Sequence, residues 1–96
     1  MAHLRFVSMK IEVRKPSADE LKKLGVFGWE IWRCDVSTFD WTYSEKETCY
    51  VLGGKVKVEA AGQSVSFGPG DLAVFPAGLS CVWKVAKPVR KHYRFG

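Results

Sequence analysis

Five residues of this chain carry side chains that could bind or transform a small molecule: Trp41, Tyr43, Glu47, Cys81 and Trp83. A carboxylate can supply charge or transfer a proton, and a thiol becomes a nucleophile when it is deprotonated. Aromatic rings can stack on a flat or cationic molecule. Glu47 and Cys81 are therefore candidate catalytic groups, and Trp41, Tyr43 and Trp83 are candidate ligand-binding groups.

All five candidates fall in segments whose polar and apolar residues alternate with the period of a β-strand: residues 38–43, 46–52 and 80–85. Within each segment, the candidates share a face with apolar neighbours, whereas polar residues such as Lys84 take the opposite face. We therefore expect the five side chains to converge on one interior volume.

Glu47 is the residue of this set that most needs an explanation. If it shares the inward face with Cys49 and Val51, its carboxylate enters an apolar region. Burying a polar group without a partner costs about 1–3 kcal/mol, and burying a charge costs more. The carboxylate then needs a hydrogen-bonding or charged partner, or access to water. The alternative is that Glu47 faces solvent or bonds to a backbone amide.

Each candidate also has a purely structural interpretation. The aromatic rings can fill the interior of a small barrel, and Cys81 and Cys49 can be small buried hydrophobes, because no neighbouring cation is evident that would lower the pKa of a thiol. His92 would share a face with Arg90 and Arg94, which favours an exposed position, and Tyr93 and Phe95 would then point inward.

The elements that position these residues are predominantly strands. One short helix is predicted over residues 18–24, with Ser17 as its N-cap, Glu20 as the capping-box partner and Gly25 at its end. From residue 29 onward, short segments of period two are separated by turns rich in glycine and proline. This pattern predicts an all-β fold, either an antiparallel sandwich or a small barrel.

The composition limits the chain to one domain. Its 96 residues are 47% apolar, and we expect the domain core to span about residues 29–95. Residues 1–8 precede a second methionine, Met9, and are expected to be flexible or additional to the fold.

The charge and the cysteines argue against several classes of protein. The net charge of +5 is dispersed and comes with no nucleic-acid reading motif, and no apolar run reaches the roughly 18 residues of a membrane span. The three cysteines form no CxxC pair, which fits a reducing compartment. We expect a soluble, cytoplasmic protein that binds neither nucleic acid nor membrane, although a targeting segment upstream remains an open alternative.

Two stretches of the sequence resemble the motifs of the cupin family. "GPGDLAVFPAGLSCVW", residues 68–83, resembles the second cupin motif: Gly70, Pro76 and Gly78 match, and Cys81 stands where the motif has histidine. "WTYSEKETCYVLGG", residues 41–54, resembles the first motif. Its glutamate and glycine match as Glu47 and Gly54, and Trp41 and Tyr43 stand at the two histidine positions, or Asp40 and Thr42 with the longer spacing.

This resemblance implies a cupin-type antiparallel β-barrel, or jelly roll, with a ligand or metal in its mouth. Metal-binding cupins hold the ion with three histidines and one glutamate, and this sequence keeps only Glu47 of that set. Indole nitrogen and neutral phenol are poor ligands. We therefore expect no bound metal and no cofactor. In detail the sequence resembles the small cupins of the group that includes the cupin domain of ureidoglycine aminohydrolase.

Three functions are consistent with these features. The first is a small-molecule pocket at a degenerate metal-site position. The second is a metal-assisted, aminohydrolase-like enzyme acting on a ureido or amino compound. The third is a structural or interaction module whose barrel is filled with side chains. A homodimer is a further expectation, since residues 30–36 could pair as an edge strand with a second copy.

Overall fold

The computed structural model describes residues 9–96, so the expectation about residues 1–8 lies outside the described part. The all-β prediction is confirmed: within residues 9–96 strands predominate, and they are accompanied by one α-helix and one 3₁₀ turn. In chain order the elements are β1 (Glu12–Arg14), α1 (Ala18–Leu24), η1 (Val26–Gly28), β2 (Glu30–Cys34), β3 (Ser37–Thr42), β4 (Glu47–Ala60), β5 (Gln63–Phe67), β6 (Leu72–Phe75) and β7 (Ser80–Phe95).

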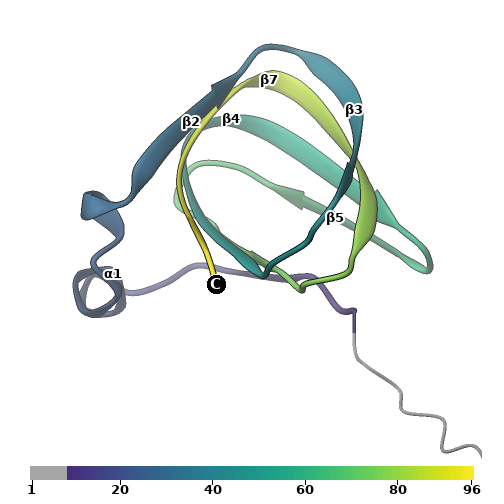
Figure 1. Ribbon diagram of the computed structural model, residues 1–96. Coiled ribbons are helices and arrows are strands. Elements are labelled where there is room, and N and C mark those ends of the chain that lie inside the picture. The colour runs from purple at the N-terminus through teal and green to yellow at the C-terminus, as the bar shows by residue number, and fades with distance from the viewer. Residues whose placement is uncertain (1–8) are drawn as a thin grey trace, which may run out of the picture.

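Helix α1 has the predicted bounds. Ser17 Oγ accepts a hydrogen bond from the Glu20 amide at 3.2 Å, and Gly25 ends the helix in the left-handed conformation, with φ of 69°. The expected capping-box role of Glu20 is wrong, because its carboxylate forms an ion pair with Arg14 of β1 instead. The helix is thereby tied to the first strand, and it lies outside the barrel wall (Figure 1).

The strands form one antiparallel sheet that curls into a barrel (Figure 1). Its main path is β1-β6-β4-β7-β2, while β3 also pairs with β7 and β5 also pairs with β4. The two long strands, β4 and β7, therefore run through most of the wall, and the shorter strands pair with one or the other half of them.

Both long strands change register where they cross from one half of the barrel to the other. The ladder between β4 and β7 is interrupted between Val51 and Val56. Gly54 lies in this interruption with φ of +101°, and a Cβ atom there would come within 2.6 Å of the Val89 Cα atom. Only glycine combines this backbone conformation with so close an approach of a second backbone.

The interior is packed largely with β-branched and aromatic side chains. Tyr43 stacks on Phe75 with ring centroids 5.1 Å apart, and Trp83 contacts both Phe75 and Phe67. Small side chains such as the buried Cys49 fill the spaces between the rings. Cys49 thus lies where a small buried hydrophobe was expected.

Candidate small-molecule site

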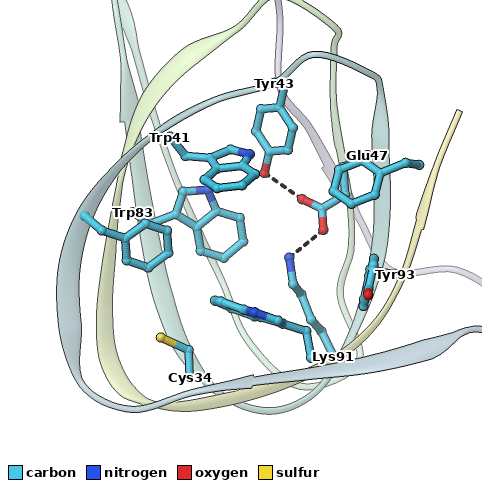
Figure 2. A pocket seen from close by; sticks show the side chains of 10 residues that line it. Cys34, Trp41, Tyr43, Glu47, Trp83, Lys91 and Tyr93 are labelled. Atoms are coloured by element: carbon cyan, nitrogen blue, oxygen red, sulfur yellow. Dashed lines mark hydrogen bonds and ion pairs between the residues drawn. The ribbon is translucent and has the colours of Figure 1, made fainter.

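A cavity of about 450 Å³ opens between β2, β3, the start of β4 and the end of β7 (Figure 2). Its walls are mostly apolar, and aromatic rings make up the larger part of them. The lining residues are Trp32, Cys34, Phe39, Trp41, Tyr43, Glu47, Trp83, Lys91, Tyr93 and Phe95. The barrel is therefore not filled solid at this end.

Glu47 is the acidic centre of the cavity, and each of its carboxylate oxygens has a partner. Oε1 accepts a hydrogen bond from the Tyr43 hydroxyl at 2.6 Å, and Oε2 accepts one from the Lys91 ammonium at 2.5 Å (Figure 2). The side chains of Lys91 and Glu47 are 6% and 4% exposed. The inward carboxylate is thus stabilised by a buried ion pair and a hydroxyl donor.

Lys91 is held on its other sides by aromatic rings. Its Nζ atom lies 4.4 Å from the ring centroid of Trp83 and 4.9 Å from that of Trp32. The negative faces of two indoles favour an ammonium at these distances. Lys91 is buried, whereas all the other lysines of residues 9–96 are exposed.

Burial sets the protonation state of the groups around this ion pair. Desolvation, reinforced by the negative charge of Glu47, raises the pKa of the Tyr43 hydroxyl far above its ordinary value. Burial likewise raises the pKa of the Cys49 thiol to about 12 and raises that of Cys81. Tyr43 therefore remains a neutral hydrogen-bond donor, and neither thiol is activated as a nucleophile at neutral pH.

The structure brings four of the five candidates together. Tyr43, Glu47 and Trp83 line the cavity and are buried, and Trp41 lines it as well. Trp41 was expected in the interior, but its side chain is 47% exposed. It lies at the end of β3, where the ring forms part of the cavity mouth.

Cys81 differs from expectation. It is buried in the core, but it does not line the cavity that contains Glu47. Its short side chain turns toward the backbone, and Sγ donates to the Trp41 carbonyl oxygen at 3.5 Å. The raised pKa and this contact argue against an activated thiol, and the catalytic role of Cys81 stays a prediction.

The end of β7 also differs from expectation. His92 was expected to be exposed but is buried, because η1 and the residue after it cover the outer face of the strand. Its Nδ1 lies 3.0 Å from the Trp29 carbonyl oxygen, and its ring packs edge-on against Phe27. Tyr93 and Phe95 line the cavity as expected.

Lys91 and Trp32 line the cavity and were missed by the sequence reasoning. Lys91 lies two residues before Tyr93, so the alternation that sends Tyr93 inward also sends Lys91 inward. We did not assign Lys91 to the interior from this alternation because a charged lysine side chain is usually exposed. Trp32 follows Ile31 in the same strand, and Ile31 is apolar but exposed. The sequence of this strand therefore did not show which face points inward.

The family to which the chain belongs follows from comparison with known sequences. The family model of the EutQ-like cupin domain matches residues 21–93. The chain belongs to the EutQ-like cupin domain family. This assignment agrees with the barrel and with the cupin motifs.

Solved structures support this membership. A DUF861 family protein from Thermotoga maritima is 48% identical to this EutQ-like cupin, with a TM-score of 0.89, and the match covers 91% of this chain and 100% of that one. The Clostridium difficile EutQ protein is 29% identical with a TM-score of 0.64, over 68% of this chain and 52% of its own. A putative ethanolamine utilization protein EutQ from Salmonella typhimurium is 28% identical, with a TM-score of 0.63, over 68% and 53%.

These matches refine the resemblance noted in the sequence. They identify the EutQ-like type of cupin, and the resemblance to the ureidoglycine aminohydrolase group stays a prediction. No curated protein shows significant similarity to the sequence. Within residues 9–96, α1 and η1 are both too short to cross a membrane.

The cavity of this EutQ-like cupin does not fit a metal ion of the kind that other cupins hold. Within residues 9–96, no three side chains of His, Cys, Asp or Glu gather closely enough to coordinate one. The ammonium of Lys91 lies directly against Glu47 and supplies the positive charge there. A cation at this carboxylate would have to displace Lys91, and among residues 9–96 it would find no imidazole ligand in the cavity lining.

We expect the purified protein to carry no stoichiometric transition metal and to show the same melting temperature with and without EDTA. A metal that binds the native state stabilises it by an amount that grows with the logarithm of its affinity, and residues 9–96 lack the ligands for tight binding. Elemental analysis by mass spectrometry and a thermal melt check this. Near one equivalent of Zn, Mn, Fe or Ni per chain, with a lower melting temperature in EDTA, would contradict the expectation.

Proposed function

We propose that this EutQ-like cupin binds a small, flat molecule that is uncharged or anionic in the cavity around Glu47 and Lys91. The single observation that carries the proposal is an aromatic-walled cavity with one polar centre. Its volume of about 450 Å³ falls in the range of about 300–1,000 Å³ that is usual for small-molecule sites. Flat ring surfaces from β2, β3 and β7 favour a ligand that can stack.

The charges in the cavity decide which ligands fit. Lys91 neutralises Glu47, so a cationic ligand finds no free negative charge and would be repelled by the ammonium. An ammonium has three N–H donors, and the carboxylate of Glu47 accepts from it at one oxygen. A ligand oxygen can accept another of these donors. This favours a neutral or anionic ligand over the cationic one considered from the sequence.

The open cavity also bears on the two other functions, a structural module and a metal-assisted aminohydrolase. A barrel filled with side chains would favour a purely structural module, and here space remains beside Trp41 and Trp83. A metal-assisted aminohydrolase would need a ligand set that the described residues do not offer. Binding of an organic molecule is the function that the cavity supports best.

Three one-ring probes of different charge test the proposal: benzoate, benzyl alcohol and benzylamine. Titration into ¹⁵N-labelled protein should shift the indole N–H signals of the cavity tryptophans with benzoate and benzyl alcohol but not with benzylamine. Trp29 lies outside the cavity lining and serves as an internal reference. Binding of benzylamine alone, or of none of the three, would contradict the proposal.

Replacing Trp41 with alanine should weaken benzoate binding about two- to tenfold, because a lost aromatic contact is worth roughly 0.5–1.5 kcal/mol. The free energy of unfolding should change little, since the ring is 47% exposed. Phe27→Ala is a matched control: its ring is 65% exposed and lies outside the cavity lining. Equal affinities of Trp41→Ala and the wild type would remove Trp41 from the site.

A further inference from the structure

We propose that the Lys91 amine adds to the carbonyl carbon of an aldehyde or ketone held in the cavity and forms a covalent imine. The proposal rests on the proposed function, because the carbonyl compound must first bind between the aromatic walls. The ligands are then flat carbonyl compounds, and Lys91 both binds them and reacts with them.

The position of Lys91 is the first reason. Its side chain rises from β7 into the middle of the cavity, and Nζ is surrounded by the lining residues (Figure 2). Every other lysine of residues 9–96 is exposed on the outside of the barrel. A single primary amine is thus confined where a stacked ligand would present its polar edge. Confinement of two reacting groups raises their effective concentration by orders of magnitude.

The contact with Glu47 is the second reason. An amine attacks a carbonyl only after it has lost a proton, and Glu47 Oε2, 2.5 Å from Nζ, is placed to accept that proton. Both side chains are almost fully buried. Proton transfer converts two buried charges into two neutral groups and removes the desolvation cost of the ion pair. When an apolar ligand excludes water from the cavity, the neutral pair is favoured further over the ion pair, because the charges lose solvation.

The two groups suffice for a balanced reaction. Nζ forms a bond to the carbonyl carbon while the C=O π bond breaks. The oxygen takes the proton held by Glu47, and Glu47 takes one proton back from the newly bonded nitrogen, which gives a neutral carbinolamine. Glu47 then donates this proton to the hydroxyl, the C–O bond breaks, and water leaves as the C=N bond forms, so that a protonated imine lies beside the Glu47 carboxylate. The net change is condensation of one amine with one carbonyl compound to give an imine and one water, with no oxidant or reductant.

Tyr43 has a positioning role in this scheme. Its hydroxyl donates to Glu47 Oε1 at 2.6 Å, and burial with the adjacent carboxylate keeps it protonated. The hydrogen bond fixes the carboxylate so that Oε2 faces Lys91. The phenol itself does not contact the reacting carbon in this scheme.

Reductive trapping tests the proposal. The full chain is incubated with benzaldehyde and sodium cyanoborohydride, which reduces an imine to a stable secondary amine. Peptide mapping by mass spectrometry should find a benzyl group on Lys91, formed on the order of tenfold faster than on the exposed lysines. Labelling of Lys91 at or below the rate of the exposed lysines would overturn the proposal.

Variants and a carbonyl-free probe separate the possible failures. Lys91→Arg keeps the positive charge beside Glu47 but offers no amine, so trapping in the cavity should disappear while the fold is retained. Lys87→Arg alters an exposed lysine of the same strand and should leave the labelling of Lys91 unchanged. Binding of benzyl alcohol without trapping of benzaldehyde would refute the imine but retain the proposed function. Binding of neither probe would refute both.

Discussion

Replacing Lys91 with methionine is expected to lower the free energy of unfolding by about 3–5 kcal/mol, because it leaves the Glu47 carboxylate buried without its cation. Glu47 would keep only the hydrogen bond from Tyr43. Methionine approximates the volume of lysine, so the loss reports charge and not packing. Since small domains are stable by about 5–15 kcal/mol, a substantial part of the variant would unfold under mild urea.

The double variant Lys91→Met/Glu47→Gln is the control for this effect. It removes both charges and leaves a neutral amide that can still accept the Tyr43 hydrogen bond. We expect it to recover most of the lost stability, because neutral groups avoid the desolvation cost of a buried ion pair. Urea unfolding of the four proteins of this cycle measures the coupling. A Lys91→Met variant within about 1 kcal/mol of the wild type would show that Glu47 has another partner or reaches water.

Replacing Trp83 with alanine is expected to destabilise the protein by about 3–5 kcal/mol, the usual cost of truncating a large buried aromatic residue. The ring is 2% exposed and packs against Phe39, Phe67 and Phe75. It also forms the surface over which the Lys91 ammonium lies. Thermal and urea unfolding should both show the loss.

Trp83→Phe serves as its control. A phenylalanine ring can keep the stacking on Phe39, whose centroid lies 6.0 Å from that of Trp83. It also removes the indole Nε1, which within residues 9–96 is buried without a hydrogen-bond partner. We expect this variant to lose about half as much stability as Trp83→Ala or less. Equal losses in the two variants would mean that the position needs the full volume of the indole, which a phenylalanine ring does not fill.

The fold was largely predictable because local patterns determine it. Period-two alternation identified the strands, and Ser17 and Gly25 marked both ends of the helix. The close approach at Gly54 was not predictable from local pattern, because it depends on Pro88 and Val89, which are distant in sequence. The ion pair of Glu20 with Arg14, in place of the expected capping box, has the same origin. A partner from another element competes with a local one.

The site was predictable in part. Alternation placed Tyr43, Glu47 and Trp83 on inward faces, and the structure shows them at one cavity. Alternation fixes only the face of a strand, and not the depth of a side chain, so it did not separate Cys81 from the cavity or place Trp41 at the mouth. Alternation also sends Lys91 inward, but a buried lysine needs a partner, and its pairing with Glu47 becomes evident only when both strands are placed together.

Strand β7 pairs with β2, β3 and β4, all of which precede it in the chain. During synthesis on the ribosome, these three strands therefore emerge before the strand that completes their hydrogen bonding. Their edges stay open to other chains until β7 has been made. We therefore expect misassembly of this barrel to occur mainly between the emergence of β4 and the arrival of β7.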